Sequence, residues 1–331
     1  MNNKEYLDLL YKNVLQRDFN EENEKYHLNQ LENGVPREVV LKQFFDSEEF
    51  KNIQNSKDKY PDGHYYSPIP SSIDRKKFIS NYQNISKNLD GINFNLEQQL
   101  KNWEKFKNFL PKFKFPSHKT SLYDYFYIND SFGLTDAFLV FSFLLFYKPK
   151  RIIEVGSGMS SCLFSDINRL FFNYQIEITL VEPNPNFLNS VLSANSQKNF
   201  NILEKKVQSV SVNDFKLLKS NDLLFIDSSH IAKLGSDVNY LFFDIIPNLN
   251  NNVLVHIHDI FRNFDYPSEW VSEGRSWNEA YLLRAFLLFN TNFDIEFYTS
   301  YIFDRIPNIF ENNYLNLKSN LGGCLWLRKT K

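Results

Sequence analysis

From Arg151 onward, short apolar segments alternate with stretches of helical periodicity, and this alternation restricts the fold more than any other feature of the sequence. Such alternation is typical of a parallel β-sheet whose strands are joined by crossover helices. Two later apolar segments, 293–303 and 322–330, have no long helix between them, which favours an antiparallel pair at one edge of the sheet. The sequence therefore predicts an α/β fold with five successive strands at 151–155, 178–182, 201–207, 222–227 and 252–259.

A glycine-rich turn, EVGSG at 154–158, directly follows the first predicted strand and precedes a predicted helix. Glycines at such a turn let a ligand approach the backbone, which a side chain would block. Nicotinamide dinucleotides often bind there, but Ser161 stands where the third glycine of their GxGxxG pattern belongs. We therefore expect a cofactor to bind at Gly156, Ser157 and Gly158. The missing third glycine argues against a nicotinamide dinucleotide as that cofactor.

Two carboxylates at strand ends indicate the charge of that cofactor. Glu154 would repel a pyrophosphate, whereas S-adenosylmethionine carries a sulfonium, an ammonium and no phosphate, so Coulomb's law favours the latter. Glu182 ends the second predicted strand, where a carboxylate can accept hydrogen bonds from both ribose hydroxyls. We expect Glu154 and Glu182 to bind the cofactor, together with Asp227 at the end of the fourth predicted strand.

Four segments at the ends of predicted strands are EVGSG, LVEPNP, FIDSSH and VHIHDIF. Together they resemble the class I S-adenosylmethionine-dependent methyltransferases, most closely the branch found with bacterial sugar and polysaccharide pathways. The resemblance covers about residues 60–330. It implies a Rossmann-like seven-stranded sheet with the last strand antiparallel, which agrees with the predicted edge pair, and it implies S-adenosylmethionine as the cofactor.

Titratable side chains follow the fourth and fifth predicted strands, where ligands bind in doubly wound sheets. Asp227 and His230 come after the fourth strand, and His258 and Asp259 end the fifth. Strand alternation sends His256 and His258 to one face, with Asp259 opposite or at the turn. We expect Asp227, His230, His258 and Asp259 to share one cleft with the glycine turn, and His256 to have a structural role.

Two interpretations of this cluster stay open. In one, His230 or His258 accepts the proton of an acceptor hydroxyl, because imidazole titrates near neutral pH. In the other, Asp227 and Asp259, with His258 as a third ligand, hold a divalent cation such as Mg²⁺ that orients the acceptor oxygens. Carboxylates at these two strand ends occur in some metal-dependent O-methyltransferases of the family that the sequence resembles.

The acceptor pocket is expected after the fifth strand, within 265–286. Tyr266, Trp270 and Trp277 can stack on a sugar ring, and Arg275 can bind a carboxylate or phosphate. The predicted function is methyl transfer to a hydroxyl of a sugar or glycan-linked acceptor. The alternatives are a non-catalytic binding or assembly protein with the same fold, and a nicotinamide-dependent sugar oxidoreductase.

The first part of the chain has a different pattern of apolar residues, with helical spacing and no short apolar strands. Helical spacing of apolar residues predicts a small all-helical domain at 1–55, which resembles a phycobilisome-linker module and implies docking to a protein partner. Residues 56–120 are expected to form a connector and helical cap, followed by the methyltransferase domain at 121–331. Residues 63–71 are a candidate lid.

The charge balance and the apolar runs exclude other classes of partner. A net charge of -2 provides no basic field for nucleic acid or an anionic membrane. The longest apolar run, 137–147, is shorter than the about 20 residues that a transmembrane helix needs. An acidic N-terminus unlike a signal peptide, together with two cysteines outside any CxxC pattern, predicts a cytoplasmic protein without a zinc site or disulfide.

Overall fold

The computed structural model describes residues 1–331 except 16, 20–24, 56–59, 83–88, 312–314 and 320. It divides the chain into two compact units, Met1–Lys77 and Phe78–Lys331. The predicted limits at 55 and 120 stay predictions, because the division reflects compactness and helix α5 crosses it.

The first unit is helical, as its apolar spacing predicts. Leu7, Tyr11, Val40 and Phe44 are buried together in its core. Gly34 has φ +83° at the end of one helix and Pro36 begins the next, so the chain turns between two helices. Its helices are α1 Asn3–Val14, α2 Lys25–Glu32, α3 Arg37–Asp46, α4 Glu48–Asn55 and α5 Ser72–Asn81, the last ending in the second unit.

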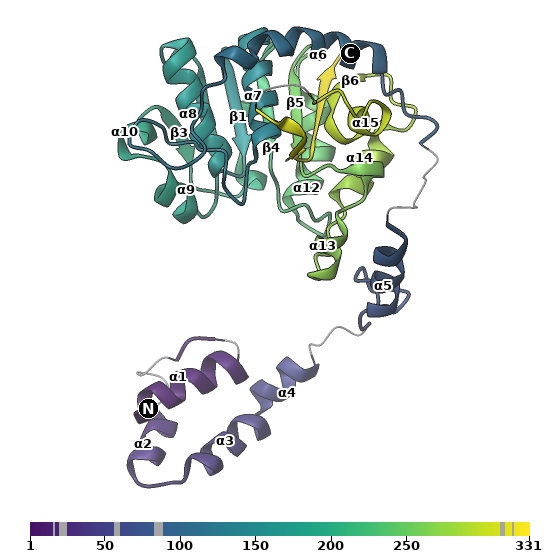
Figure 1. The fold of residues 1–331 in the computed structure, drawn as a ribbon. Coiled ribbons are helices and arrows are strands. Elements are labelled where there is room, and N and C mark those ends of the chain that lie inside the picture. Colours follow the sequence, from purple (N-terminus) through teal and green to yellow (C-terminus); the bar gives the residue numbers. More distant parts are fainter. Residues whose placement is uncertain (16, 20–24, 56–59, 83–88, 312–314, 320) are drawn as a thin grey trace. The chain divides into compact units, whose positions relative to one another are not determined.

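A seven-stranded sheet forms the centre of the second unit (Figure 1). Its order is β3-β2-β1-β4-β5-β7-β6, with β7 antiparallel to both neighbours and the pairs among β1–β5 parallel. The predicted sheet with an antiparallel last strand is confirmed. The strands are β1 Arg151–Val155, β2 Glu177–Val181, β3 Phe200–Leu203, β4 Leu223–Ile226, β5 Leu254–His258, β6 Phe293–Tyr298 and β7 Cys324–Lys329.

The sequence overestimates two strands. The chain leaves β3 after Leu203 rather than continuing to 207, and β6 ends at Tyr298 because helix α15, Thr299–Arg305, begins at the next residue. The apolar pattern of 299–303 belongs to this helix, which buries Ile302. Periodicity over so few residues does not separate the end of a strand from a short helix.

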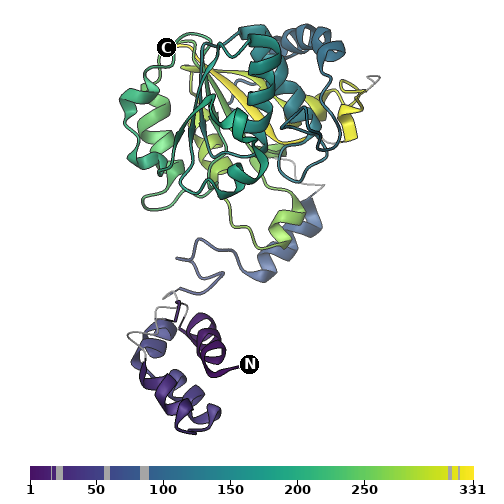
Figure 2. The same ribbon diagram turned by 90° about the vertical axis from the view of Figure 1, so that its left-hand side faces the viewer.

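Alternate residues of the strands point to two separate cores. Ile152, Leu180 and Phe225 pack on one face, while Ile153 and Leu224 pack on the other. Helices cover both faces (Figures 1 and 2), so most strands are buried on both sides and read as continuous apolar runs.

Helices and shorter helical turns connect the strands of the second unit. The apolar run at 137–147 lies in a buried helix, as predicted, and within the described ranges no helix has the length and apolar character of a membrane span. The α-helices are α6 Leu96–Phe106, α7 Leu134–Tyr147, α8 Met159–Phe172, α9 Asn186–Val191, α10 Ala194–Gln197, α11 Val212–Phe215, α12 Asp237–Tyr240, α13 Ser268–Ser272 and α14 Glu279–Leu287. The other turns are η2 Lys107–Lys112, η3 Val207–Ser209, η4 Leu241–Ile245, η5 Ile246–Asn248, η6 Arg262–Phe264 and η7 Leu317–Ser319.

Candidate active site

The glycine turn after β1 is fixed by backbone contacts with the neighbouring strands. Gly156 has φ +81°, and its N–H donates to the Val181 carbonyl at 3.1 Å. A Cβ on Gly156 would lie 1.9 Å from the Asp227 carbonyl oxygen. Glycine is thus required for the close approach of this turn to the end of β4, which brings Asp227 beside it.

Glu154 lies beneath the turn and does not line a described cavity. Its side chain is fully buried, and its two carboxyl oxygens accept hydrogen bonds from Ser160 (2.5 Å) and Ser161 (2.6 Å). Burial raises the pKa of Glu154 to about 8, so the group is largely neutral at neutral pH. The negative charge that favours a cation at this end of the sheet therefore comes from other carboxylates.

We expect Glu154→Gln to remove a pH dependence of stability. The folded-state pKa of Glu154 is raised above its unfolded value, so its contribution is fully present below about pH 4.5 and is lost as pH rises through about 8. The loss is on the order of 5 kcal/mol. Urea unfolding from about pH 5 to about pH 9 measures the free energy of unfolding of both proteins. This free energy should fall more steeply with rising pH in the wild type than in Glu154→Gln. Glu204→Gln, at an exposed position, is the control, and parallel profiles for Glu154→Gln and wild type would contradict the assignment.

Glu182 borders a cavity of about 440 Å³ at the carboxyl ends of β1, β2 and β4. Its carboxylate accepts hydrogen bonds from the backbone N–H groups of Ser157 (3.1 Å) and Asn184 (2.8 Å). The bond from Ser157 joins Glu182 to the glycine turn. Ser157 also has a buried hydroxyl oxygen with no hydrogen-bond partner among the described residues. The lining residues are Val155, Gly156, Val181, Glu182, Pro183, Lys206, Val207, Gln208, Asp227, Ser228, Ser229, Lys233, Gly235, Ser236 and Asp237.

Asp227, His230 and Asp259 meet next to this cavity. Nε2 of His230 lies 3.4 Å from an oxygen of each aspartate, and one potential ligand atom from each of the three residues lies within 4.8 Å of the others. His230 and Asp259 both have φ +59°. Left-handed backbone at a non-glycine residue costs about 1–3 kcal/mol and occurs often at functional sites, where the surrounding structure enforces it.

Glu279, at the start of α14, holds His230 from the other side. Its buried carboxylate bonds Nδ1 of His230 at 2.8 Å and accepts from the Ser228 hydroxyl at 2.9 Å. The backbone N–H groups of Asn278 and Glu279 donate to the His230 carbonyl at 3.0 and 3.1 Å. Ring and backbone of His230 are thus both fixed by the first turn of α14.

The carboxylates around His230 determine its charge. Burial alone would lower the pKa of His230, but hydrogen bonds to Asp227 and Glu279 outweigh it and raise the pKa to about 10. The imidazole is therefore protonated at neutral pH and cannot accept a further proton. Burial raises the pKa of Asp259 to about 6, which leaves this carboxylate largely ionised at pH 7.

The two strand histidines occupy one face, as alternation predicts. Nε2 of His256 lies 3.4 Å from Nδ1 of His258. His256 is fully buried and stacks on Phe225 with ring centroids 4.1 Å apart, and burial holds its pKa well below the usual value. His258 lies 3.7 Å from Asp259. The structure therefore groups His230 with the two aspartates, where the sequence predicted His258 as the third metal ligand.

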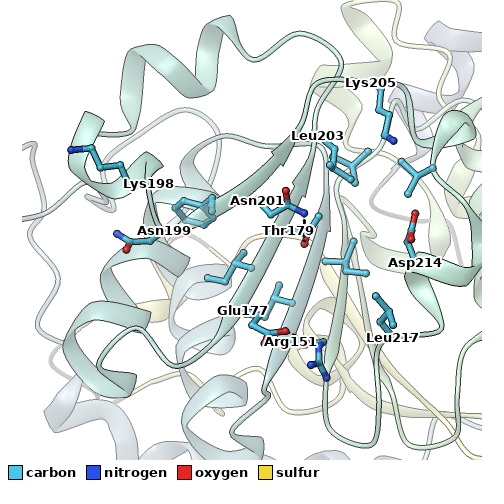
Figure 3. Close-up of a pocket in the computed structure, with 16 residues that line it drawn as sticks. Arg151, Glu177, Thr179, Lys198, Asn199, Asn201, Leu203, Lys205, Asp214 and Leu217 are labelled. Atoms are coloured by element: carbon cyan, nitrogen blue, oxygen red, sulfur yellow. Dashed lines mark hydrogen bonds and ion pairs between the residues drawn. The ribbon is translucent and has the colours of Figure 1, made fainter.

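A second cavity, of about 590 Å³, lies over β1, β2 and β3 (Figure 3). Arg151 and Glu177 form an exposed ion pair at 2.8 Å on its wall, and Thr179 and Asn201 face each other across the strands. None of the predicted site residues lines it. We place the candidate site at the Asp227 cavity, where the titratable groups converge.

Comparisons with known proteins identify the domains of the chain. Residues 153–260 match a family model described as a methyltransferase domain, and residues 1–53 match a domain of unknown function, DUF4214. An uncharacterized protein of Archaeoglobus fulgidus is 34% identical over 168 residues, which cover 49% of this chain and 75% of the archaeal protein. The chain belongs to the same family as this archaeal protein.

Solved structures resemble the chain only distantly. A protein of Staphylococcus aureus described as a caffeoyl-CoA O-methyltransferase is 14% identical, with a TM-score of 0.38 over 78% of this chain and 100% of its own. A CmcI structure described as Mg-SAM is 12% identical, with a TM-score of 0.33 over 59% of this chain and 72% of its own. The methyltransferase domain is therefore assigned from the family model and the sheet order.

Sequence reasoning missed Glu279. Nothing marks an isolated acidic residue in the first turn of a predicted helix, where carboxylates are common because they favour the helix N-terminus. Only the fold shows that α14 begins against the loop after β4. The Asn278 side chain, which accepts from the Ala232 N–H at 2.6 Å, was missed for the same reason.

Glu279→Gln should lower turnover by about 10- to 100-fold, the usual cost of losing a carboxylate that orients a site histidine. Cofactor affinity should stay nearly unchanged, because Glu279 is not among the residues that line the cavity. Turnover is measured with labelled cofactor and affinity by calorimetry. Imidazole NMR should show the pKa of His230 falling from about 10 in the variant, since a neutral amide replaces one of its carboxylates. Glu204→Gln is the exposed control, and an unchanged His230 signal would refute the coupling.

Proposed function

We propose that the protein is an S-adenosylmethionine-dependent O-methyltransferase that acts on a hydroxyl of a sugar or glycan-linked acceptor. The observation that carries the proposal is the position of Asp227, which lines the cavity beside the glycine turn and also belongs to the cluster with His230 and Asp259. A cofactor in the cavity and an acceptor at the cluster would therefore meet at this residue.

The cavity fits the cofactor in size and charge. Its volume of about 440 Å³ lies within the about 300–1,000 Å³ typical of small-molecule sites. Glu182 and Asp227 place carboxylates along its wall, while Lys206 and Lys233 are exposed at its rim. S-adenosylmethionine would supply a methyl group already activated by its sulfonium. We assign the binding of that cofactor to Gly156, Ser157, Gly158, Glu182 and Asp227, with Glu154 supporting the turn from below.

The donor set of the cluster fits a divalent cation. Carboxylate oxygens are the ligands that Mg²⁺ prefers, and an imidazole suits several other divalent metals. Asp227 and Asp259 would hold such an ion, and His230 would join them as a ligand by releasing the Nε2 proton that it carries without the ion. The ion would orient an acceptor hydroxyl and lower its pKa. His258 contacts Asp259 from behind and would keep it in place.

In the proposed reaction, Asp259 accepts the proton that the acceptor hydroxyl loses as its oxygen attacks the methyl carbon. In the cluster without an ion, Asp259 suits this role because it is largely ionised at neutral pH, whereas His230 already carries its proton. The oxygen–carbon bond forms as the carbon–sulfur bond breaks. The protein contributes mainly alignment of the reactants and exclusion of water.

The acceptor class and the role of the first unit are parts of the same proposal. Trp277 lies 4.4 Å from the His230 ring, so an aromatic wall borders the cluster, as in sites that bind sugars. We assign to residues 1–55 the docking of a protein partner, with no role in the chemistry. Location in the cytoplasm stays a prediction.

The test is incubation of the full chain with labelled S-adenosylmethionine and a panel of nucleotide sugars and glycans, together with calorimetry of the cofactor alone. We expect cofactor binding and label transfer to a hydroxyl. Loss of transfer on chelation and recovery with Mg²⁺ would support the metal. Absence of cofactor affinity would overturn the proposal in favour of a non-catalytic binding protein, and absorbance of bound reduced nicotinamide would favour an oxidoreductase.

A further inference from the structure

The segment between α13 and α14 carries an arginine in an unusual setting. The Arg275 guanidinium carbon lies 4.4 Å from the Trp270 ring centroid and 4.9 Å from that of Trp277. The two indoles are themselves in edge contact, with centroids 5.1 Å apart. Two aromatic rings therefore hold one cation by cation–π contacts.

This arginine is held in place but keeps donors to offer. Its Nε bonds Glu273 at 2.8 Å, and neither η nitrogen donates to any residue that the structure describes. The side chains of Arg275 and Glu273 are 35% and 51% exposed. An ion pair this exposed to water is weak, so it does not prevent a second anion from binding.

The position of Arg275 relates it to the cluster. Trp277 contacts both the guanidinium and the imidazole of His230, whose ring centroid lies 4.4 Å from its own. One indole thus separates the arginine from the Asp227–His230–Asp259 group. Trp277 therefore has a positive charge beside it at Arg275. It also contacts His230, which three carboxylates surround.

We propose that Arg275 is a specificity residue that binds a carboxylate or phosphate carried by the acceptor sugar, and so directs a hydroxyl of that sugar to the cluster. The proposal rests on the proposed function and adds that the acceptor is anionic. A planar guanidinium bonds either group in a bidentate manner, which a lysine cannot reproduce, and the η nitrogens of Arg275 donate to no other described residue. Trp270 and Trp277 hold the guanidinium so that little side-chain freedom is lost on binding.

Protection of the tryptophans tests this without the cofactor. Trp103 and Trp326 are buried and Trp270 and Trp277 are partly exposed, so acrylamide quenches mainly the latter pair. The probes are glucuronate, glucose 6-phosphate and glucose. Both anionic sugars, or one of them, should reduce quenching at concentrations where glucose does not, and the difference between the two identifies carboxylate or phosphate.

Arg275→Gln should weaken this protection at least about tenfold, which corresponds to about 1.4 kcal/mol. The protection in Arg275→Lys should lie between that of Arg275→Gln and that of the wild type. The lysine variant also keeps the test valid if Arg275→Gln folds poorly. Arg305→Gln is the matched control, since Arg305 also lies on an aromatic ring, 5.3 Å from Tyr301. Equal protection by glucose, no protection by either anionic sugar, or an unchanged Arg275→Gln would overturn the proposal.

Calorimetry of S-adenosylmethionine separates this inference from the proposed function. Cofactor affinity should be the same in wild type and Arg275→Gln, because Arg275 is not among the residues lining the cavity. Cofactor binding without selective protection refutes the anionic acceptor alone. Selective protection without cofactor binding refutes the methyltransferase proposal and leaves an anion-selective sugar site.

Discussion

Asp227→Asn is expected to lower methyl transfer by about 10²- to 10³-fold, the usual cost of removing one preorganised charge from an active site. Asparagine keeps the shape of the side chain but removes the charge that Asp227 presents to the cavity and to His230. Affinity for Mn²⁺, measured by electron paramagnetic resonance, should fall at least about tenfold, because a neutral amide is a weaker ligand than a carboxylate. Turnover is measured with the acceptor that the glycan panel identifies.

Asp237→Asn is the matched control for this variant. Asp237 lines the same cavity, but it bonds the Ser229 N–H and hydroxyl at 2.8 and 2.6 Å and lies outside the cluster. Its replacement should affect stability slightly and leave Mn²⁺ binding intact. Equal losses in the two variants would mean that Asp227 acts only through the shape of the cavity.

Gly156→Ala should destabilise the second unit by about 3 kcal/mol or more. A non-glycine residue in the left-handed region costs about 1–3 kcal/mol. In addition, the added Cβ would lie only 1.9 Å from a backbone carbonyl oxygen, which would have to shift. Because that oxygen belongs to Asp227, relief of the clash should displace the cluster and abolish cofactor binding. Chemical unfolding and calorimetry measure the two effects.

Gly274→Ala separates the two causes. Gly274 has φ +85°, nearly the same as Gly156, but no atom lies within 4 Å of its added Cβ. This control should cost about 1 kcal/mol from the backbone alone and leave cofactor binding unchanged. Similar destabilisation of both variants would show that the contact between the glycine turn and the end of β4 has little influence.

The fold could be predicted because its signals are local. Apolar strands buried on both faces, a glycine turn and a late pair without a long helix all leave patterns in neighbouring residues, and the sheet of β1–β7 agrees with them. The same local patterns placed Asp227, His230, His258 and Asp259 at adjacent strand ends. Strand ends were less certain, as the helix after Tyr298 shows.

The electrostatics of the site could not be predicted, because they depend on burial and on partners distant in sequence. Glu154 is the acidic residue of the most specific motif, yet complete burial keeps it largely neutral, although hydrogen bonds from Ser160 and Ser161 act in the opposite direction. By residue type alone His230 is a candidate base, but the fold gives it Glu279, 49 positions away, as a partner that keeps it protonated. Residue type gives the range of chemistry that a side chain can perform, and its surroundings select from that range.

The attachment of α14 to the His230 loop makes the cluster sensitive to events outside it. Two backbone amides and one carboxylate at the start of this helix hold a single residue, and the helix directly follows the segment that carries Arg275 and Trp277. A molecule that binds to that segment and displaces it would shift the start of α14, and the His230 imidazole would move with it. Binding of the acceptor would then be coupled to the positioning of the catalytic groups.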